Sequence, residues 1–397
     1  MNHKSDAGKL DLVVGNGRKN TAVQIKHFSK SPTRQSWSWA KTARKTDIKM
    51  TSRLISAFIS GCASTSFTSE EKKFFSEFQP WGLILFGRNC QTPDQVKELT
   101  SEFRSLVGRK DAPVLIDQEG GRVQRLGPPK NYWIKYPAAA SFGKLYSKCA
   151  VHALRAARNT ARLMADDLAE VGVNVNCLPV LDVPQPNGHN IVGDRAYAMS
   201  GEIVLALART HVAGLLDGGV LPVMKHIPGH GRAIVDSHLE LPIVSVDRAA
   251  LESVDFKTFA GFADCPMAMT AHVVYEALDP KHPATLSRIV LRDVVRKQLG
   301  FLGLLMSDDL SMKALQGTFE QKTNGALEAG CDVVLHCNGD LAEMHEVAKA
   351  AGPLKGKSMA RAKAALRHVR KPIAYDKRVA LKDLEAVLKL QDNQAAA

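Results

Sequence analysis

The chain repeats one arrangement of apolar and polar positions eight times between residues 54 and 337. Short runs rich in apolar and β-branched residues alternate with longer stretches in which apolar residues recur at helical spacing. This alternation is typical of repeated βα units and predicts a parallel sheet. The eight expected strands are residues 54–60, 81–86, 112–117, 173–183, 220–226, 266–274, 303–309 and 331–337.

Helices are expected between these strands. Residues 93–108 begin with proline and end with glycine, and residues 153–172 also end with glycine, as helices commonly do. Eight strand–helix alternations in about 300 residues favour an α/β fold with a single (β/α)8 barrel of the TIM type. A doubly wound open sheet is the alternative. We expect residues 50–397 to form the barrel domain, including closing helices such as residues 358–372.

Residues 1–49 lack this periodicity and are rich in Lys, Ser, Thr, Gln and Asn, so we expect a disordered basic extension. They carry eleven Lys or Arg against three Asp, and therefore most of the chain's formal charge of +13. The extension is either a basic interaction arm or a segment upstream of a native start at Met50. We favour the second, because organised sequence begins abruptly at residue 53. A lipoprotein signal ending at Cys62 is disfavoured by its short apolar stretch.

Composition restricts the class of protein. The chain is 45% hydrophobic and 23% charged, and no run approaches the roughly 18 apolar residues that span a bilayer, so we expect a soluble protein without a membrane partner. The seven cysteines are scattered and form no C-x-x-C pair, which favours a reducing cytoplasm over a disulfide framework or a zinc ribbon. The small positive charge outside the extension neither demands nor excludes an anionic ligand, and we expect no nucleic-acid partner.

Polar residues stand at the carboxyl ends of the expected strands, where barrel active sites are built. They are Asp117, Asp182, Lys225, His226, His272 and Asp308. We expect them to converge on one mouth of the barrel. Asp308 and Asp309 are adjacent, and because neighbouring strand residues point to opposite sides, only one of them should face this mouth. The other is expected to be a structural or capping acid facing a helix over residues 311–317.

These residue types favour sugar chemistry. An inward carboxylate near Lys225 would have its ionised form favoured by the positive charge, as a nucleophile or an oxocarbenium-stabilising anion requires. Charged groups that can bind hydroxyls with two hydrogen bonds are a common means of holding a polyhydroxylated ring. The candidates for binding the ring in this way are Asp117, Arg125, Arg195 and Lys225.

The segment KHIPGHGRAIVDSHLELP, residues 225–242, holds three of the thirteen histidines. Pro228 and the two glycines interrupt the strand, so the residues that follow are expected to be a loop that can swing over a substrate. Asp236 and His238 lie two residues apart, on the same side of an extended loop. The carboxylate can therefore orient the imidazole and raise its basicity, which makes the pair a candidate acid/base dyad.

Two other interpretations of this segment stay open. His226, His230, Asp236 and His238 are also metal-ligand types, as in barrel metal hydrolases, although the cation of Lys225 and the lack of an H-x-H motif at an early strand argue against a metal. Alternatively, His230 only bonds backbone groups around a turn shaped by the glycines.

Five motifs, in order along the chain, resemble the bacterial β-N-acetylglucosaminidases of glycoside hydrolase family 3, the cytoplasmic type that trims muropeptides during peptidoglycan recycling. The resemblance covers about residues 53–339. The motifs are LIDQEGGRVQRL, PVLDV with GDRAY, KHIPGHG with DSH, TAHVVY and SDDLSMKAL. The chain has Ala196 and Tyr197 after Arg195 where the family more often has Ser and Phe. Too few residues follow the barrel for the second domain that many relatives carry.

The resemblance implies a retaining double displacement in a single barrel. Asp308 would be the nucleophile, and His238, oriented by Asp236, would be the acid and then the base. The residues implied to hold the N-acetylglucosamine ring are Asp117, Arg125, Arg195, Lys225 and His226, with His272 lining the pocket. We expect a monomer acting on N-acetylglucosaminyl-anhydromuramyl substrates without a metal or cofactor. Substrate assistance by the acid pair, a non-catalytic muropeptide sensor, a metal-dependent hydrolase and nucleic-acid binding by the extension are the alternatives.

Overall fold

The computed structural model describes residues 54–130, 132–186 and 188–395. Within this part, eight parallel strands close into a barrel, each strand bonded to its sequence neighbour in the barrel and the last to the first. The strands are β1 (Ser56–Ser60), β2 (Pro80–Leu85), β3 (Val114–Ile116), β6 (Val175–Asn176), β7 (Leu221–Ile227), β9 (Met267–Thr270), β11 (Leu304–Asp309) and β12 (Val333–His336). The predicted TIM-type barrel is therefore confirmed, and so are its eight strands. The expectations for residues 1–49 and for a start at Met50 lie outside the described residues.

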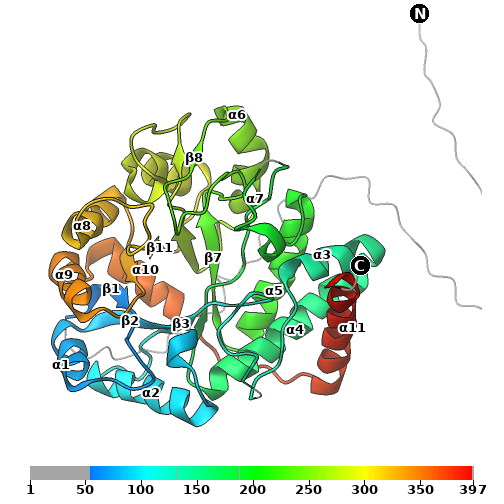
Figure 1. Cartoon of the computed structure of the whole chain (residues 1–397), viewed down its shortest axis with the longest axis horizontal. Helices are drawn as coiled ribbons and strands as arrows, with labels where there is room; N and C mark the ends of the chain where they lie inside the picture. Colours follow the sequence, from blue (N-terminus) through cyan, green and yellow to red (C-terminus); the bar gives the residue numbers. More distant parts are fainter. Residues whose placement is uncertain (1–53, 131, 187, 396–397) are drawn as a thin grey trace, which may run out of the picture. The chain divides into compact units, whose positions relative to one another are not determined.

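Helices surround the barrel, as Figure 1 shows. They are α1 (Ser69–Phe78), α2 (Pro93–Leu106), α3 (Ala139–Lys148), α4 (Ala150–Glu170), α5 (Gly201–Asp217), α6 (Arg248–Leu251), α7 (Lys257–Ala260), α8 (Phe319–Ala329), α9 (Leu341–Ala351), α10 (Gly356–Leu366) and α11 (Lys377–Ala395), with a π-helix at Ile289–Gln298. Helix α2 begins as expected, because Thr92 accepts a hydrogen bond from the Gln95 N–H and Pro93 takes the first position.

The helix predicted over residues 311–317 is wrong. These residues form turns, with Gly317 at a positive φ of 98°, and the next helix is α8. The reason is local: the Asp309 carboxylate accepts hydrogen bonds from both the backbone N–H and the hydroxyl of Ser311, which stabilises a turn directly after β11. Thr318 then caps α8 by accepting from the Gln321 N–H, so the helix begins only after the glycine.

Alternate side chains of the strands enter two separate apolar layers. One set fills the barrel interior, and includes Ile59, Leu115, Val175, Val223, Met306 and Leu335. The other set packs against the helices, and includes Phe58, Val114, Ile116, Met224, Leu305 and Val334. Residues 54–62, considered above as part of a lipoprotein signal, contain the first barrel strand, and Cys62 is fully buried.

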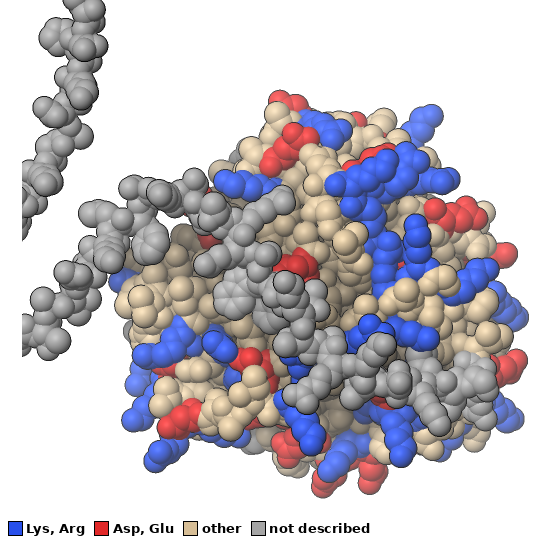
Figure 2. Space-filling view, turned by 180° about the vertical axis from the view of Figure 1, so that it is seen from behind, with Lys and Arg blue, Asp and Glu red and all other residues tan. Residues whose placement is uncertain are grey.

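The face of the described domain that is seen from behind carries charges of both signs. In Figure 2, seen from behind, blue Lys and Arg side chains occur beside red Asp and Glu side chains over the part that is not grey. In the described part of the chain, no helix combines the length and the apolar character needed to cross a membrane.

A buried amide fixes the end of β3 to β6. Asn176 is fully buried, its Oδ1 accepts from the Gln118 N–H at 3.0 Å, and its Nδ2 donates to the Gln118 carbonyl at 2.9 Å. Gln118 opens the short hairpin of β4 (Gln118–Gly120) and β5 (Val123–Gln124), and its own Oε1 accepts from the Arg125 and Leu126 N–H groups. The clamp therefore holds the backbone on either side of Gln118 at the mouth of the barrel.

We predict that Asn176→Ala lowers the free energy of unfolding by about 3 kcal/mol, because it leaves a buried N–H and a buried C=O of Gln118 without partners. Urea-induced unfolding measures this loss. The matched control is Asn324→Ala, at an exposed position of α8, which should change stability by less than about 0.5 kcal/mol. Equal effects of the two substitutions would show that the amide clamp contributes nothing specific.

Candidate active site

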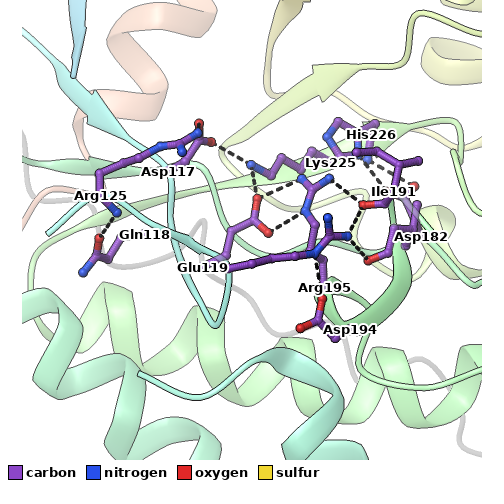
Figure 3. Close-up of polar contacts among 12 residues, drawn as sticks. Asp117, Gln118, Glu119, Arg125, Asp182, Ile191, Asp194, Arg195, Lys225 and His226 are labelled. Atoms are coloured by element: carbon purple, nitrogen blue, oxygen red, sulfur yellow. Dashed lines mark hydrogen bonds and ion pairs between the residues drawn. The ribbon is translucent and has the colours of Figure 1, made fainter. Parts of the chain in front are cut away.

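A cavity of about 210 Å³ lies at the carboxyl ends of the strands. The polar residues that line it come from different strand ends and loops: Asp117, Glu119, Arg122, Arg125, Arg195, Lys225, His226, His230, Ser237, His238, Asp308 and Asp309. Of the six predicted strand-end residues, Asp117, Lys225, His226 and Asp308 border this cavity, whereas Asp182 and His272 do not. Figure 3 shows the polar contacts around Asp117, Glu119, Arg125, Arg195, Lys225 and His226.

Lys225, at the end of β7, is buried between two carboxylates (Figure 3). Its Nζ lies 2.8 Å from Asp117 and 2.6 Å from Glu119, and Arg125 contacts the other Asp117 oxygen at 3.1 Å. Burial alone lowers the pKa of the lysine, but the two carboxylates outweigh this effect and raise it. The ammonium group therefore keeps its charge inside the barrel mouth.

Glu119 joins this lysine to Arg195. Both oxygens of Glu119 accept from the guanidinium of Arg195, at 2.9 Å each, in a bidentate pair. Burial raises the pKa of the glutamate, yet Arg195 and Lys225 overcome that effect and lower it to about 2. We call Asp117, Glu119, Arg125, Arg195 and Lys225 the charged cradle.

Asp182 bonds two of the histidines that border the cavity. One of its oxygens lies 2.7 Å from Nδ1 of His226, and the other accepts from the backbone N–H of His230 at 2.7 Å. Because Asp182 is fully buried, its pKa would rise, but the two histidines lower it below the usual range. The contact fixes Nδ1 of His226 as a donor and leaves Nε2 as the ring nitrogen without a protein partner among the described residues.

Asp308 and Asp309 both border the cavity, in contrast to the expectation that only one faces it. The pairing of β11 with β12 shifts register between Met306 and Asp309, so regular alternation does not hold here. The two carboxylates differ in their bonding. Asp309 accepts from Ser311 and from the Cys337 N–H, whereas among the described residues Asp308 accepts only from the N–H of Asp309, at 2.8 Å.

The groups that keep Asp308 ionised are not those predicted. Burial raises its pKa, but His272 and His226, and then the Asp309 N–H, lower it below the ordinary value. Lys225 instead bonds the cradle carboxylates Asp117 and Glu119.

His272 was predicted to line the pocket, but it is not among the residues that border the cavity. It is fully buried, its Nδ1 is 2.7 Å from the Thr285 hydroxyl, and its Nε2 is 3.0 Å from the Asp309 carbonyl. With both ring nitrogens engaged, His272 supports the end of β11.

His238 stands on a segment that we call the dyad loop, residues 228–240. Its Nδ1 lies 2.8 Å from Asp236, and the same carboxylate oxygen accepts the His238 N–H at 2.9 Å. The imidazole borders the cavity although 60% of its side chain is exposed. The hydrogen bonds to His238 lower the pKa of Asp236 despite some burial, so the carboxylate stays charged.

Sequence reasoning missed several residues of this site. Glu119 lies in the quoted LIDQEGG motif, two residues after Asp117, but its role depends on Arg195, which is 76 positions away. Ser237, between the members of the dyad, was also missed. For the metal interpretation, the described residues contain no group of three or more His, Cys, Asp or Glu side chains placed to hold an ion.

Comparison with known proteins assigns the chain to a family. Residues 36–371 match the model of the glycosyl hydrolase family 3 N-terminal domain. The chain belongs to glycosyl hydrolase family 3. This family 3 chain is 39% identical to a beta-hexosaminidase of Alkalilimnicola ehrlichii over 289 residues, covering 72% of this chain and 81% of that protein. It is therefore a glycoside hydrolase, as the motifs predicted.

Solved structures agree with this family 3 assignment. Native NagZ from Neisseria gonorrhoeae superimposes with a TM-score of 0.72 at 30% identity, covering 85% of this chain and 96% of that one. NagZ from the same organism in complex with N-trifluoroacetyl-D-glucosamine gives a TM-score of 0.72 at 30% identity, with 86% and 98% covered. These relationships support the predicted β-N-acetylglucosaminidase activity.

The cradle makes the stability of this family 3 enzyme depend on pH in a defined direction. The pKa of Glu119 falls from 4.5 to about 2 on folding, so its contribution is complete above about pH 4.5 and is lost as the pH falls towards 2. We predict that the difference in unfolding free energy between the wild type and Glu119→Gln shrinks by about 2 kcal/mol between pH 6 and pH 3.

Urea titrations at several pH values measure this difference. Glu77→Gln, at an exposed position of α1, is the matched control. The same pH dependence in both variants would contradict the role given to the ion pairs of Glu119.

Proposed function

We propose that this enzyme is an exo-acting retaining β-N-acetylglucosaminidase that removes non-reducing N-acetylglucosamine from muropeptides through a glycosyl-Asp308 intermediate. The observation that carries the proposal is one small cavity bordered by a sparsely bonded carboxylate, a charged cradle and an Asp–His dyad. Its volume of about 210 Å³ is below the usual size of a drug-sized ligand pocket, which suits one sugar residue.

Asp308 is the group best placed to act as nucleophile. Its only hydrogen bond from the described residues is the one from the Asp309 N–H, so one carboxylate oxygen is free to attack. Its lowered pKa keeps it anionic at neutral pH. In the first step Asp308 forms a bond to the anomeric carbon while the bond to the leaving oxygen breaks.

The dyad supplies and removes the proton. Protonated His238 gives its Nε2 proton to the leaving oxygen, and Asp236 stabilises the ring through Nδ1. In the second step neutral His238 takes a proton from water, the water oxygen bonds to the anomeric carbon, and the bond to Asp308 breaks. A histidine thus does what a second carboxyl does in most retaining glycosidases.

The cradle binds the ring. Asp117 and Arg125 have side chains exposed by 15% and 28%, so they can still bond hydroxyls, whereas Lys225 and Glu119 are nearly inaccessible. Fixed donors and acceptors of this kind hold the ring without reorganisation when it binds. His226 adds its free Nε2 at the same wall.

The biological setting is part of the proposal. The sequence motifs resemble the cytoplasmic enzymes of peptidoglycan recycling, and the structure is similar to NagZ of Neisseria gonorrhoeae. All seven cysteines are free thiols, which suits a reducing compartment. We infer that the enzyme acts in the cytoplasm, as a monomer, on N-acetylglucosaminyl-anhydromuramyl substrates.

We predict that Asp308→Ala lowers kcat on one defined N-acetylglucosaminyl-anhydromuramyl substrate by about 10³-fold or more, and that His238→Ala lowers it by about 10²- to 10⁴-fold. Product release measured by chromatography tests both, with circular dichroism to show that the fold is kept. Glu276→Ala, at an exposed position, is the control and should be as active as the wild type. Near-normal turnover by Asp308→Ala would refute the assigned nucleophile.

A covalent label separates this mechanism from substrate assistance, which the presence of both acids at the cavity keeps open. We predict that a 5-fluoro N-acetylglucosaminyl fluoride inactivates the enzyme and that mass spectrometry locates the sugar on the peptide containing Asp308. The Asp309 carboxylate, already bonded by Ser311 and Cys337, should carry no label. Turnover without any labelled peptide would favour attack by the substrate's own acetamido oxygen.

A further inference from the structure

We propose that the hydrogen bond between His230 and Ser237 is a latch that positions the Asp236–His238 dyad over the cavity. His230 and Ser237 are then positioning residues, acting through His238. This inference rests on the proposed function, because it assumes that His238 is the acid and base of the reaction.

The burial pattern of the dyad loop singles out one residue. From residue 234 to residue 240 every side chain is exposed or half-buried except Ser237, which is 3% exposed. Its neighbours on either side are the two members of the dyad. The dyad is therefore carried on a segment whose one buried contact lies directly between Asp236 and His238.

That contact is with His230. The Ser237 hydroxyl and Nε2 of His230 lie 3.1 Å apart and share a hydrogen bond, and His230 is itself 4% exposed. Nδ1 of His230 has no partner among the described residues, so the bond to Ser237 is the one side-chain hydrogen bond of this ring. Leaving one member of such a buried hydrogen-bonded pair without its partner costs about 1–3 kcal/mol, which favours the position in which Ser237 bonds His230.

His230 is a rigid support for the latch. Its backbone N–H donates to the buried Asp182, and its ring packs edge-on against His226 with centroids 5.6 Å apart. At the next position, a Cβ on Gly231 would lie 2.1 Å from the Val183 carbonyl, so the loop stem is pressed against the segment after β6. The Gly229 carbonyl also accepts from the Tyr275 hydroxyl at 2.5 Å.

The chemical state of His230 suits this task. Burial, and then the neighbouring His226, lower its pKa to about 4. The ring is therefore neutral at the pH of the cytoplasm and pairs with a hydroxyl without needing a counter-charge. Together with its burial and its bond to Ser237, this favours a positioning role for His230.

The latch predicts a specific kinetic defect. General acid catalysis needs the donor within hydrogen-bond reach of the leaving oxygen, and matters most when the leaving group is a poor one. Without the hydroxyl of Ser237 the dyad loop samples more positions, and His238 is correctly placed for less of the time. Attack by Asp308 on a substrate whose leaving group needs no proton is unaffected.

The test compares aryl N-acetylglucosaminides that share one sugar and differ in leaving group. For Ser237→Ala we expect kcat/KM to fall about 10- to 100-fold with an unactivated phenyl leaving group and less than about 3-fold with 2,4-dinitrophenyl. Competitive inhibition by free N-acetylglucosamine should not change. The matched control is Ser245→Ala, an exposed serine that follows the dyad loop and should behave as the wild type.

A double-mutant cycle with His230→Leu tests whether the two residues act as one unit. The double variant His230→Leu/Ser237→Ala should be no slower on the phenyl glycoside than the slower single variant, because each substitution alone already opens the latch. Independent, multiplying losses would overturn the pairing. Equal losses on both glycosides would overturn the positioning role, because they would indicate general damage to the site.

Failure of the latch is distinguishable from failure of the proposed function. If the wild type hydrolyses none of these glycosides, the proposed function is refuted, and the latch with it. The same holds if the loss of kcat/KM in His238→Ala is equal for the phenyl and 2,4-dinitrophenyl glycosides. If the loss in His238→Ala does depend on the leaving group, but Ser237→Ala has the same kcat/KM as Ser245→Ala on both glycosides, only the latch is refuted.

Discussion

The mouth of this barrel is organised by the need to neutralise two buried cations. Lys225 and Arg195 are almost removed from water, and an uncompensated charge in such a place would cost several kcal/mol. Glu119 contacts both of them, and Asp117 contacts Lys225 and Arg125. Each of these side chains is therefore fixed by another, and the cradle has its shape before any ligand arrives.

The barrel provides the members of the cradle from places that are far apart in the chain. Lys225 lies near the end of β7, Asp117 follows β3, and Arg195 comes from the segment between β6 and α5. None of these could be held within 3 Å of another by local structure alone. The parallel strands deliver them to one edge, and buried amides such as Asn176 fix the backbone between them.

The sequence was sufficient for the barrel because the apolar runs and the strand ends repeat with a regular period. It was also sufficient to predict that polar residues at the strand ends lie close together, because a closed parallel sheet brings the strand ends to one edge. The sequence did not predict which of these side chains bond one another. Whether Lys225 bonds Asp308 or Glu119 depends on distances in the folded chain, which residue spacing does not give. The prediction that only one of Asp308 and Asp309 faces the mouth failed because the register shifts at the end of β11. The turn after Asp309 was missed because it depends on side-chain bonds to Ser311 that outweigh helix propensity.

In the proposed mechanism, these hydrogen bonds and ion pairs also explain how the carboxylate of Asp308 stays available for attack. A lysine bonded to Asp308 would hold the carboxylate ionised, but it would occupy the oxygen that must attack. The cations are instead taken up by Asp117 and Glu119, and Asp308 is kept anionic by imidazoles and one backbone N–H. Under this proposal, ring binding and nucleophilic attack use separate charges in one cavity, so strong binding of the hydroxyls does not weaken the attacking group.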